Sequence, residues 1–201
     1  VIDTLEQFLV ATPADFDAAE QIGLRARHLE QALRLEHGLP AENVGIGFEA
    51  DAGAAAIVDL AEFFELAVVP DLPPRYNIAP TQPAPVILVA SRRPGREFRT
   101  LRWGLIPAWA KDPVIGNRMI NARAETVADK PAFRSAFRRR RCLIVSDGFY
   151  EWKKEPRRKQ PFYIRMRDDT PFAFAGLWEH WEGGDGTRVD SCALLTTQPN
   201  D

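Results

Sequence analysis

A short polar strand carries the first group of residues whose types and spacing suit chemistry. From Met119 to Glu125, apolar or small residues alternate with polar ones. This period of two is typical of a β-strand, and it places Asn121, Arg123 and Glu125 on one face. A carboxamide, a guanidinium and a carboxylate on one face suit an anionic substrate that carries a base. The simpler interpretation of Asn121 is a strand-end amide without any chemistry.

A second predicted strand, residues 142–152, ends at an acid between two aromatic residues. Its apolar run finishes with Glu151, between Tyr150 and Trp152. Desolvation among apolar groups raises the pKa of a carboxyl, which then holds a proton near neutral pH and serves as a general acid or base. The alternative for this pattern is a surface glutamate that pairs with an arginine or a lysine.

Charge is strongly divided along the chain, although the formal net charge is only −2. Residues 1–70 contain 13 acids and 3 bases, whereas residues 91–141 contain 14 bases and 4 acids. The basic part includes four consecutive arginines, Arg138–Arg141, with tryptophans nearby in the sequence. Basic residues interleaved with aromatic ones predict a nucleic-acid surface. A solvated face, or one neutralised by the acidic N-terminal part, would have the same composition.

Composition argues against several other classes of protein. With 201 residues, of which 45% are hydrophobic, the chain can form a globular core. No apolar run is long enough for a membrane-spanning helix, so no membrane partner is expected. Cys142 and Cys192 each lie in an apolar run and predict buried thiols rather than a disulfide. The three histidines have no ligand-like spacing with them, so we expect no metal and no cofactor.

The periodicity predicts an α+β domain with a curved, mostly antiparallel sheet or open barrel and few helices. Apolar residues at helical spacing predict helices over 24–37 and 57–66. The predicted strands are 44–48, 85–91, 98–103, 119–125, 142–152, 161–167, 172–178 and 192–196, with a hairpin turn at 183–186. Prolines in segment 69–81 predict an extended loop in which Arg75, Tyr76 and Asn77 shape a pocket.

Five ordered motifs point to one family. They are RYNIAPTQ (75–82), RWGLIPAWAKD (102–112), INARAET (120–126), KPAFRSAFRRRRCLIVSDGFYEW (130–152) and FAFAGLWE (172–179). From residue 57 to residue 201, the sequence resembles the SOS-response-associated peptidase (SRAP) family. The resemblance implies a protein that senses abasic sites in single-stranded DNA and cross-links to them covalently.

The resemblance also implies a mechanism. In the family, an N-terminal cysteine, exposed by removal of methionine or of a propeptide, condenses through its amine and thiol with the ring-opened sugar aldehyde to give a thiazolidine. Asn121 would hydrogen-bond the sugar or the new ring, and Glu151 would move protons during ring opening and Schiff-base formation. A late histidine of the family assists these proton transfers.

The predicted DNA contacts combine the family motifs with the basic run. Arg123 would bind phosphate, and the tryptophans would line the path where bases are splayed and stacked. The full set of expected DNA-binding residues is Asn77, Pro80, Trp103, Trp109, Arg123, Arg138, Arg139 and Trp152.

The sequence departs from the family pattern at both ends. Counting back from the RYNIAP motif places the family's N-terminal cysteine near residues 45–50, where no cysteine occurs. Residues 1–56 are therefore expected to be an acidic, helical N-terminal extension, and residues 57–201 a SRAP domain that lacks the usual cysteine. The late histidine belongs beyond Asp201, so the domain is expected to be truncated, and His180 is not its counterpart.

Three functional interpretations stay open at this point. In the first, the chain is a SRAP protein whose ends were lost, so the family's cross-linking of abasic DNA describes its origin. In the second, it binds single-stranded or abasic DNA without catalysis, because two of the four catalytic positions are absent. In the third, its acidic N-terminal part covers the basic surface and the chain is a structural or regulatory remnant. We expect a monomer in the bacterial cytoplasm, associated with the nucleoid, with single-stranded and abasic-site DNA as partners.

Overall fold

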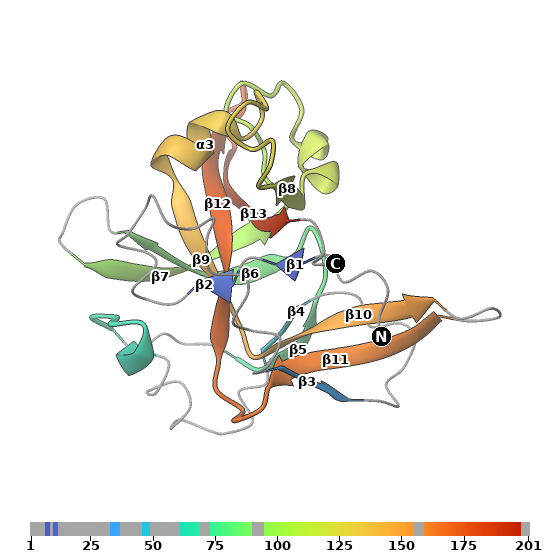
Figure 1. The fold of residues 1–201 in the computed structure, drawn as a ribbon. Helices are drawn as coiled ribbons and strands as arrows, with labels where there is room; N and C mark the ends of the chain where they lie inside the picture. The colour runs from blue at the N-terminus through green and yellow to red at the C-terminus, as the bar shows by residue number, and fades with distance from the viewer. Residues whose placement is uncertain are drawn as a thin grey trace.

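A computed structural model describes residues 61–68, 73–89, 95–154 and 159–197, together with short strands at 7–8, 10–11, 33–36 and 46–48. Most of the regular structure is strand (Figure 1). The elements are β1 (Gln7–Phe8), β2 (Val10–Ala11), β3 (Leu33–Glu36), β4 (Ile46–Phe48), β5 (Arg75–Ile78), β6 (Pro83–Val89), β7 (Arg96–Trp103), η3 (Pro113–Arg118), β8 (Asn121–Arg123), α3 (Arg134–Arg139), β9 (Arg141–Ser146), β10 (Gly148–Lys154), β11 (Lys159–Met166), β12 (Phe172–Glu182) and β13 (Arg188–Thr197).

Five strands of the larger sheet close into a barrel. The order β13-β7-β6-β9-β12 returns to its start, because β12 also pairs with β13. Four of these five pairings are antiparallel, and β13 with β7 is parallel. The predicted turn at 183–186 is confirmed, since the Gly183 amide donates to the Thr187 carbonyl at 2.8 Å between β12 and β13. The predicted mostly antiparallel barrel with few helices is therefore confirmed.

Alternation along the strands divides the core into two clusters. In β9, Leu143 and Val145 belong to one cluster, and Cys142 and Ile144 to the other, so both faces of this central strand are covered. The second cluster draws on all five barrel strands and also includes residues of β5, β10 and β11 of the smaller sheet: Ile78, Ala84, Val86, Leu88, Leu101, Trp103, Cys142, Ile144, Phe149, Ile164, Phe172, Phe174, Cys192 and Leu194. The first cluster includes Ala136 of α3, so this helix packs on the other face of the barrel strands.

The smaller sheet, in the order β3-β11-β10-β4-β5, packs against one side of the barrel (Figure 1). The place where the chain passes from the barrel to this sheet corrects one prediction. Residues 142–152 form two strands, β9 and β10, in different sheets. The Ser146 hydroxyl donates to the Gly148 carbonyl at 2.5 Å, and Asp147 accepts from Tyr163 at 2.8 Å. These bonds stabilise the corner between β9 and β10. The corner depends on polar side chains, so the apolar pattern of residues 142–152 could not reveal it.

The predicted helix over 24–37 is also corrected where the structure describes it. Residues Leu33–Glu36 form β3, which pairs antiparallel with β11 from Leu33↔Met166 to Glu36↔Tyr163. The alternation Leu-Arg-Leu-Glu suits a strand, and the edge of β11 supplies the backbone partners that an isolated segment lacks. The rest of this prediction lies outside the described residues. Of the helix predicted over 57–66, residues 57–60 also lie outside the described residues, and residues 61–63 are helical.

The boundary predicted between residues 56 and 57 stays a prediction. Strands β1 to β4, all before that boundary, pair with strands that follow it. Within the described part of the chain, no helix is long and apolar enough to cross a membrane.

Candidate nucleic-acid interface

The NAR strand lies at the end of the barrel that also carries α3 (Figure 1). Strand β8 runs parallel to the end of β13, with Ala122 opposite Leu195 and Arg123 opposite Thr196. Ala122 is fully buried, Asn121 is half-buried and Arg123 is exposed, as the period of two predicts. The Arg123 guanidinium donates to the Thr197 carbonyl at 3.2 Å. This bond holds the charged side chain beside β13, at the surface of the protein.

The RYNIAPT segment is a strand and a locked turn rather than a loop alone. Arg75 donates to the Gln82 side chain at 2.6 Å and to the Pro83 carbonyl at 3.0 Å, so both ends of the turn are tied together. Asn77 and Pro80 are both half-buried. The buried Oδ1 of Asn77 accepts no hydrogen bond from the described residues. A carboxamide oxygen in this state can accept a bond from a ligand.

Trp103 belongs to the second core cluster and is only 6% exposed. Its backbone carbonyl accepts from the Thr81 amide at 2.7 Å, and its indole Nε1 donates to the Ile120 carbonyl at 3.0 Å. The turn that follows Pro80 and the residue that precedes Asn121 are therefore both bonded to Trp103. The stacking role predicted for this tryptophan is not supported, because a base cannot reach a ring buried among core side chains.

The predicted acid lies on β10, in the smaller sheet. Glu151 is half-buried and stands opposite Phe162 of β11, and Trp152 stands opposite Pro161. The preceding residue, Tyr150, donates its hydroxyl to the Tyr76 carbonyl at 3.3 Å. Because Asn77 follows Tyr76 and Glu151 follows Tyr150, this bond ties together the two strands that carry these predicted site residues.

The four-arginine run divides into two outward and two structural residues. Arg138 and Arg139 are exposed on α3. Arg140 donates to Glu179 of β12 at 2.5 Å, and Arg141 donates to the Phe137 carbonyl at 3.3 Å. The Glu179 side chain is 5% exposed, so this ion pair fixes the C-terminal end of α3 to the barrel. The first two arginines are thus presented on an anchored helix.

Trp109 lies at the surface. It is 60% exposed, and its Nε1 lies 3.5 Å from the Pro131 carbonyl, just before α3. Exposed aromatic rings and exposed arginines are the side chains that bind single-stranded nucleic acid through base stacking and phosphate contacts.

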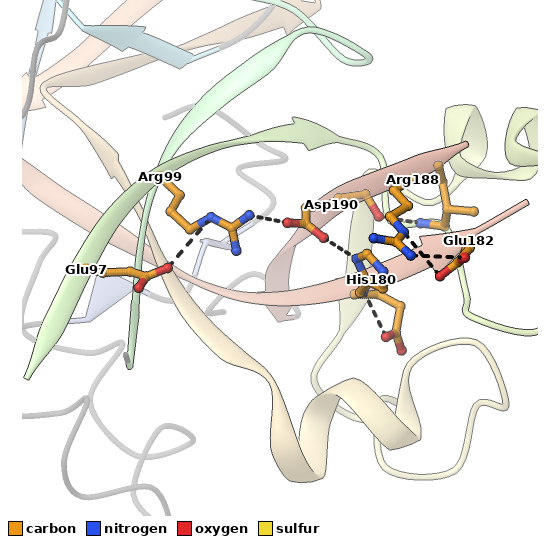
Figure 2. Close-up of polar contacts among 9 residues, drawn as sticks. Glu97, Arg99, His180, Glu182, Arg188 and Asp190 are labelled. Atoms are coloured by element: carbon orange, nitrogen blue, oxygen red, sulfur yellow. Dashed lines mark hydrogen bonds and ion pairs between the residues drawn. The ribbon is translucent and has the colours of Figure 1, made fainter. Parts of the chain in front are cut away.

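Sequence reasoning missed a polar chain across three barrel strands (Figure 2). His180 Nδ1 lies 2.6 Å from one oxygen of Asp190, whose other oxygen pairs with Arg99. Arg99 also lies 3.7 Å from Glu97. His180 and Asp190 are directly opposite in the β12–β13 hairpin, so counting outward from the turn at 183–186 would have found this pair.

The two thiols are buried, as predicted. Burial raises the pKa of Cys192 to about 12, and burial together with the neighbouring Cys192 raises the pKa of Cys142 well above its usual value. Neither thiol is therefore a ready nucleophile at neutral pH. Among the described residues, no group of three or more His, Cys, Asp or Glu could hold a metal ion.

Comparisons with known proteins give the same assignment as the motifs. The family model described as SOS response associated peptidase (SRAP) matches residues 51–201. The abasic site processing protein YoqW of Bacillus subtilis is 45% identical over 129 residues, which cover 64% of this chain and 57% of that protein. The abasic site processing protein YedK of Escherichia coli is 36% identical over 120 residues, which cover 59% of this chain and 51% of that protein. The chain thus spans somewhat more than half the length of these relatives.

Solved structures share the fold. A crystal structure of a protein from Bordetella bronchiseptica has a TM-score of 0.61 and 26% identity, covering 72% of this chain and 70% of that one. Another, from Bacteroides thetaiotaomicron, has a TM-score of 0.57 and 30% identity, covering 62% of this chain and 55% of that one. The family match extends over well more than half of the chain and includes every segment that builds the interface, so the chain belongs to the SOS response associated peptidase (SRAP) family.

Proposed function

We propose that this chain binds single-stranded DNA at abasic sites and takes part in processing them. One observation carries the proposal: the Pro80–Thr81 turn and the strand of Asn121 are both bonded to Trp103, and β5 is bonded to the strand of Glu151. These bonds link family motifs that lie far apart in the sequence, and they support a shared site. Relatives named abasic site processing proteins support the choice of substrate.

Each site residue then has a defined role. Asn121 hydrogen-bonds the opened sugar, Glu151 moves protons at its aldehyde, and Arg123 binds the adjacent phosphate. Asn77 and Pro80 shape the wall of the site. Trp109 and Trp152 stack the flanking bases, and Arg138 and Arg139 attract the backbone beyond them.

Covalent cross-linking and binding without chemistry are the two forms of this proposal. Cross-linking requires a nucleophile that is free near neutral pH. Cys142 and Cys192 are both buried with raised pKa values, so neither is ready to supply this nucleophile. In the form without chemistry, the chain marks the lesion as a monomer near the bacterial nucleoid.

The test mixes the protein with single-stranded DNA that carries one abasic site and, separately, with the intact strand. Samples are run on a denaturing gel and on a native gel. An adduct that survives denaturation only with the abasic strand supports cross-linking. A native shift that favours the abasic strand, without an adduct, supports binding alone. Equal shifts with both strands, or no shift, contradict the proposal.

A matched pair of variants links the result to the site. Asn121→Ala is expected to remove the preference for the abasic strand. Asn117→Ala changes an exposed asparagine in η3, whose side chain accepts from Arg102 at 2.5 Å, and is expected to keep that preference. Equal effects of the two substitutions would remove Asn121 from the proposed site.

A further inference from the structure

Trp103 is a buried tryptophan whose backbone and indole both make hydrogen bonds to other family motifs. Its amide donates to the Gln82 carbonyl at 2.9 Å, and its carbonyl accepts from the Thr81 amide at 2.7 Å, so its backbone holds the turn that follows Pro80. Its indole Nε1 reaches in the other direction, to the Ile120 carbonyl at 3.0 Å. One buried residue therefore joins two family motifs that lie about forty positions apart in the sequence.

The Ile120 carbonyl is a well-defined anchor for the site. It accepts a second hydrogen bond from the Leu194 amide of β13 at 3.0 Å, so both of its lone pairs are used. The next residue along the chain is Asn121. Because Ile120 is held from two sides, the backbone that carries the Asn121 carboxamide has little freedom.

The backbone just before Ile120 packs tightly against residues 104 and 105, so it has little room to shift and replace the indole hydrogen bond if that bond is lost. Leu105 donates to the Met119 carbonyl at 3.0 Å, and a Cβ at Gly104 would lie 2.5 Å from the Gly116 carbonyl oxygen. The segment before Asn121 is thus set against the end of β7 by direct backbone contact, and the indole bond fixes its position there.

We infer that Trp103 is a positioning residue: it sets the Pro80 turn against Asn121 and does not itself contact DNA. This inference rests on the proposed function, in which both segments face the abasic sugar. It assigns Trp103 to the geometry of the site, and Trp109, which is 60% exposed, to contact with bases.

Trp103→Phe tests the inference with Trp181→Phe as its control. Trp181 is also a buried tryptophan, 4% exposed, and its Nε1 donates to the Ala110 carbonyl at 2.7 Å, outside the two motifs that Trp103 joins. Since Ala110 follows Trp109, loss of this bond would act on both strands alike through base contacts, and the ratio of the two affinities is the quantity compared. Each substitution keeps an aromatic ring and removes one indole hydrogen bond. Trp103→Phe is expected to lower the ratio of abasic to intact-strand affinity by roughly three- to tenfold, with intact-strand affinity unchanged. Trp181→Phe is expected to leave the ratio unchanged.

Two results would overturn the inference. Equal losses of affinity for both strands would mean that Trp103 contacts DNA directly. An unchanged ratio in Trp103→Phe would mean that the indole bond does not position the site.

If the wild-type protein shows no preference for the abasic strand, the proposed function fails, and amide exchange then decides the positioning role alone. Faster amide exchange at residues 79, 81, 82 and 119–122 is expected in Trp103→Phe but not in Trp181→Phe, and equal exchange in both contradicts the inference.

A measurement on the wild-type protein covers the case in which Trp103→Phe does not fold. Intact single-stranded DNA is added while the indole N–H resonances of the tryptophans are recorded by NMR. The Trp103 signal is expected to exchange slowly with solvent and to keep its position, whereas the Trp109 signal shifts. A shift of the Trp103 signal as large as that of Trp109 would overturn the inference.

Discussion

The two cysteine side chains show how strongly position changes the chemistry of a residue. Both are buried in the second core cluster, on β9 and β13. The thiolate is the reactive form of cysteine, and burial among apolar groups disfavours it. These residues therefore contribute packing, and the covalent form of the proposed function has to use another nucleophile.

The first prediction concerns their reactivity. In native protein at pH 8, an aromatic disulfide reagent is expected to modify neither Cys142 nor Cys192, and both should react at once after denaturation with urea. The pH dependence follows from the raised pKa of Cys192, from 9.0 to about 12. The stabilisation of the folded protein that is linked to the Cys192 proton is fully present below pH 9, where the folded and the unfolded protein both hold that proton. It is lost as pH rises toward 12, because the thiol of the unfolded protein ionises first. Rapid native labelling would contradict the observed burial.

Gly104 supports a second prediction at the residue scale. Its φ is +128°, and an added Cβ would lie 2.5 Å from the Gly116 carbonyl oxygen. Gly104→Ala is expected to lower the free energy of unfolding by about 2–4 kcal/mol, because strain and overlap add. Gly186→Ala is the control: φ is +83°, but a Cβ meets nothing within 4 Å, so a loss of roughly 1 kcal/mol is expected from strain alone. Urea unfolding measures both, and equal losses would show that the contact with Gly116 relaxes easily.

At the scale of elements, the anchoring of α3 separates stability from binding. The helix has only six residues, and no side chain caps its N-terminus. Helices this short are marginal by themselves, so packing of Ala136 and the Arg140–Glu179 pair must hold it in place. Arg138 and Arg139, on the same helix, make no such contribution from their exposed positions.

The third prediction separates these contributions. Arg140→Ala is expected to lower the free energy of unfolding by about 3 kcal/mol, because it leaves the buried Glu179 carboxylate without its partner. Arg139→Ala, the matched change one residue earlier, is expected to stay within about 0.5 kcal/mol of wild type. Adding Glu179→Gln to Arg140→Ala should restore part of the loss. Chemical denaturation of the three variants checks this, and a similar small loss in both single variants would show that the ion pair does not anchor α3.

At the scale of the whole molecule, charge is organised by the fold as well as by the sequence. The acidic residues 1–70 and the basic residues 91–141 nearly cancel in the sum. Folding then removes several arginines from the basic face: Arg99 pairs with Asp190, Arg140 with Glu179 and Arg96 with Glu65. The exposed basic surface is therefore narrower than composition predicts, and Arg138 and Arg139 of α3, like Arg123 of β8, are among the arginines that stay exposed.

The fourth prediction follows from this narrower surface. Replacing Arg138 and Arg139 together by glutamine is expected to weaken binding to intact single-stranded DNA and to reduce the slope of log affinity against log salt by about 1 to 2. The same double change at the exposed Arg167 and Arg188 is expected to leave the slope unaltered. Fluorescence anisotropy across a salt series measures both. Weak binding at every salt concentration, by wild type as well, would instead indicate that the acidic part covers the surface.

Local pattern predicted those features that depend on neighbours in the chain. The hairpin at 183–186 and the strand at 161–167 follow from alternation and turn residues, which act within a few positions. The strand predicted over 119–125 is shorter, because only Asn121–Arg123 form β8. The break at Asp147 and strand β3 escaped prediction for one reason. Each depends on a partner strand, β11, whose position is set by tertiary contacts rather than by nearby residues.

The sequence by itself determined the family, the motifs and the types of side chain available to the site. Only the tertiary structure decided which of them are buried and which are exposed. Trp103 and Trp109 are the same residue type six positions apart, yet one is 6% and the other 60% exposed. Arg139 and Arg140 are adjacent, yet only the second pairs with Glu179. Burial is fixed by strands that pair across the barrel, such as β13 with β7 and β8, and those contacts join residues some 70 to 90 positions apart.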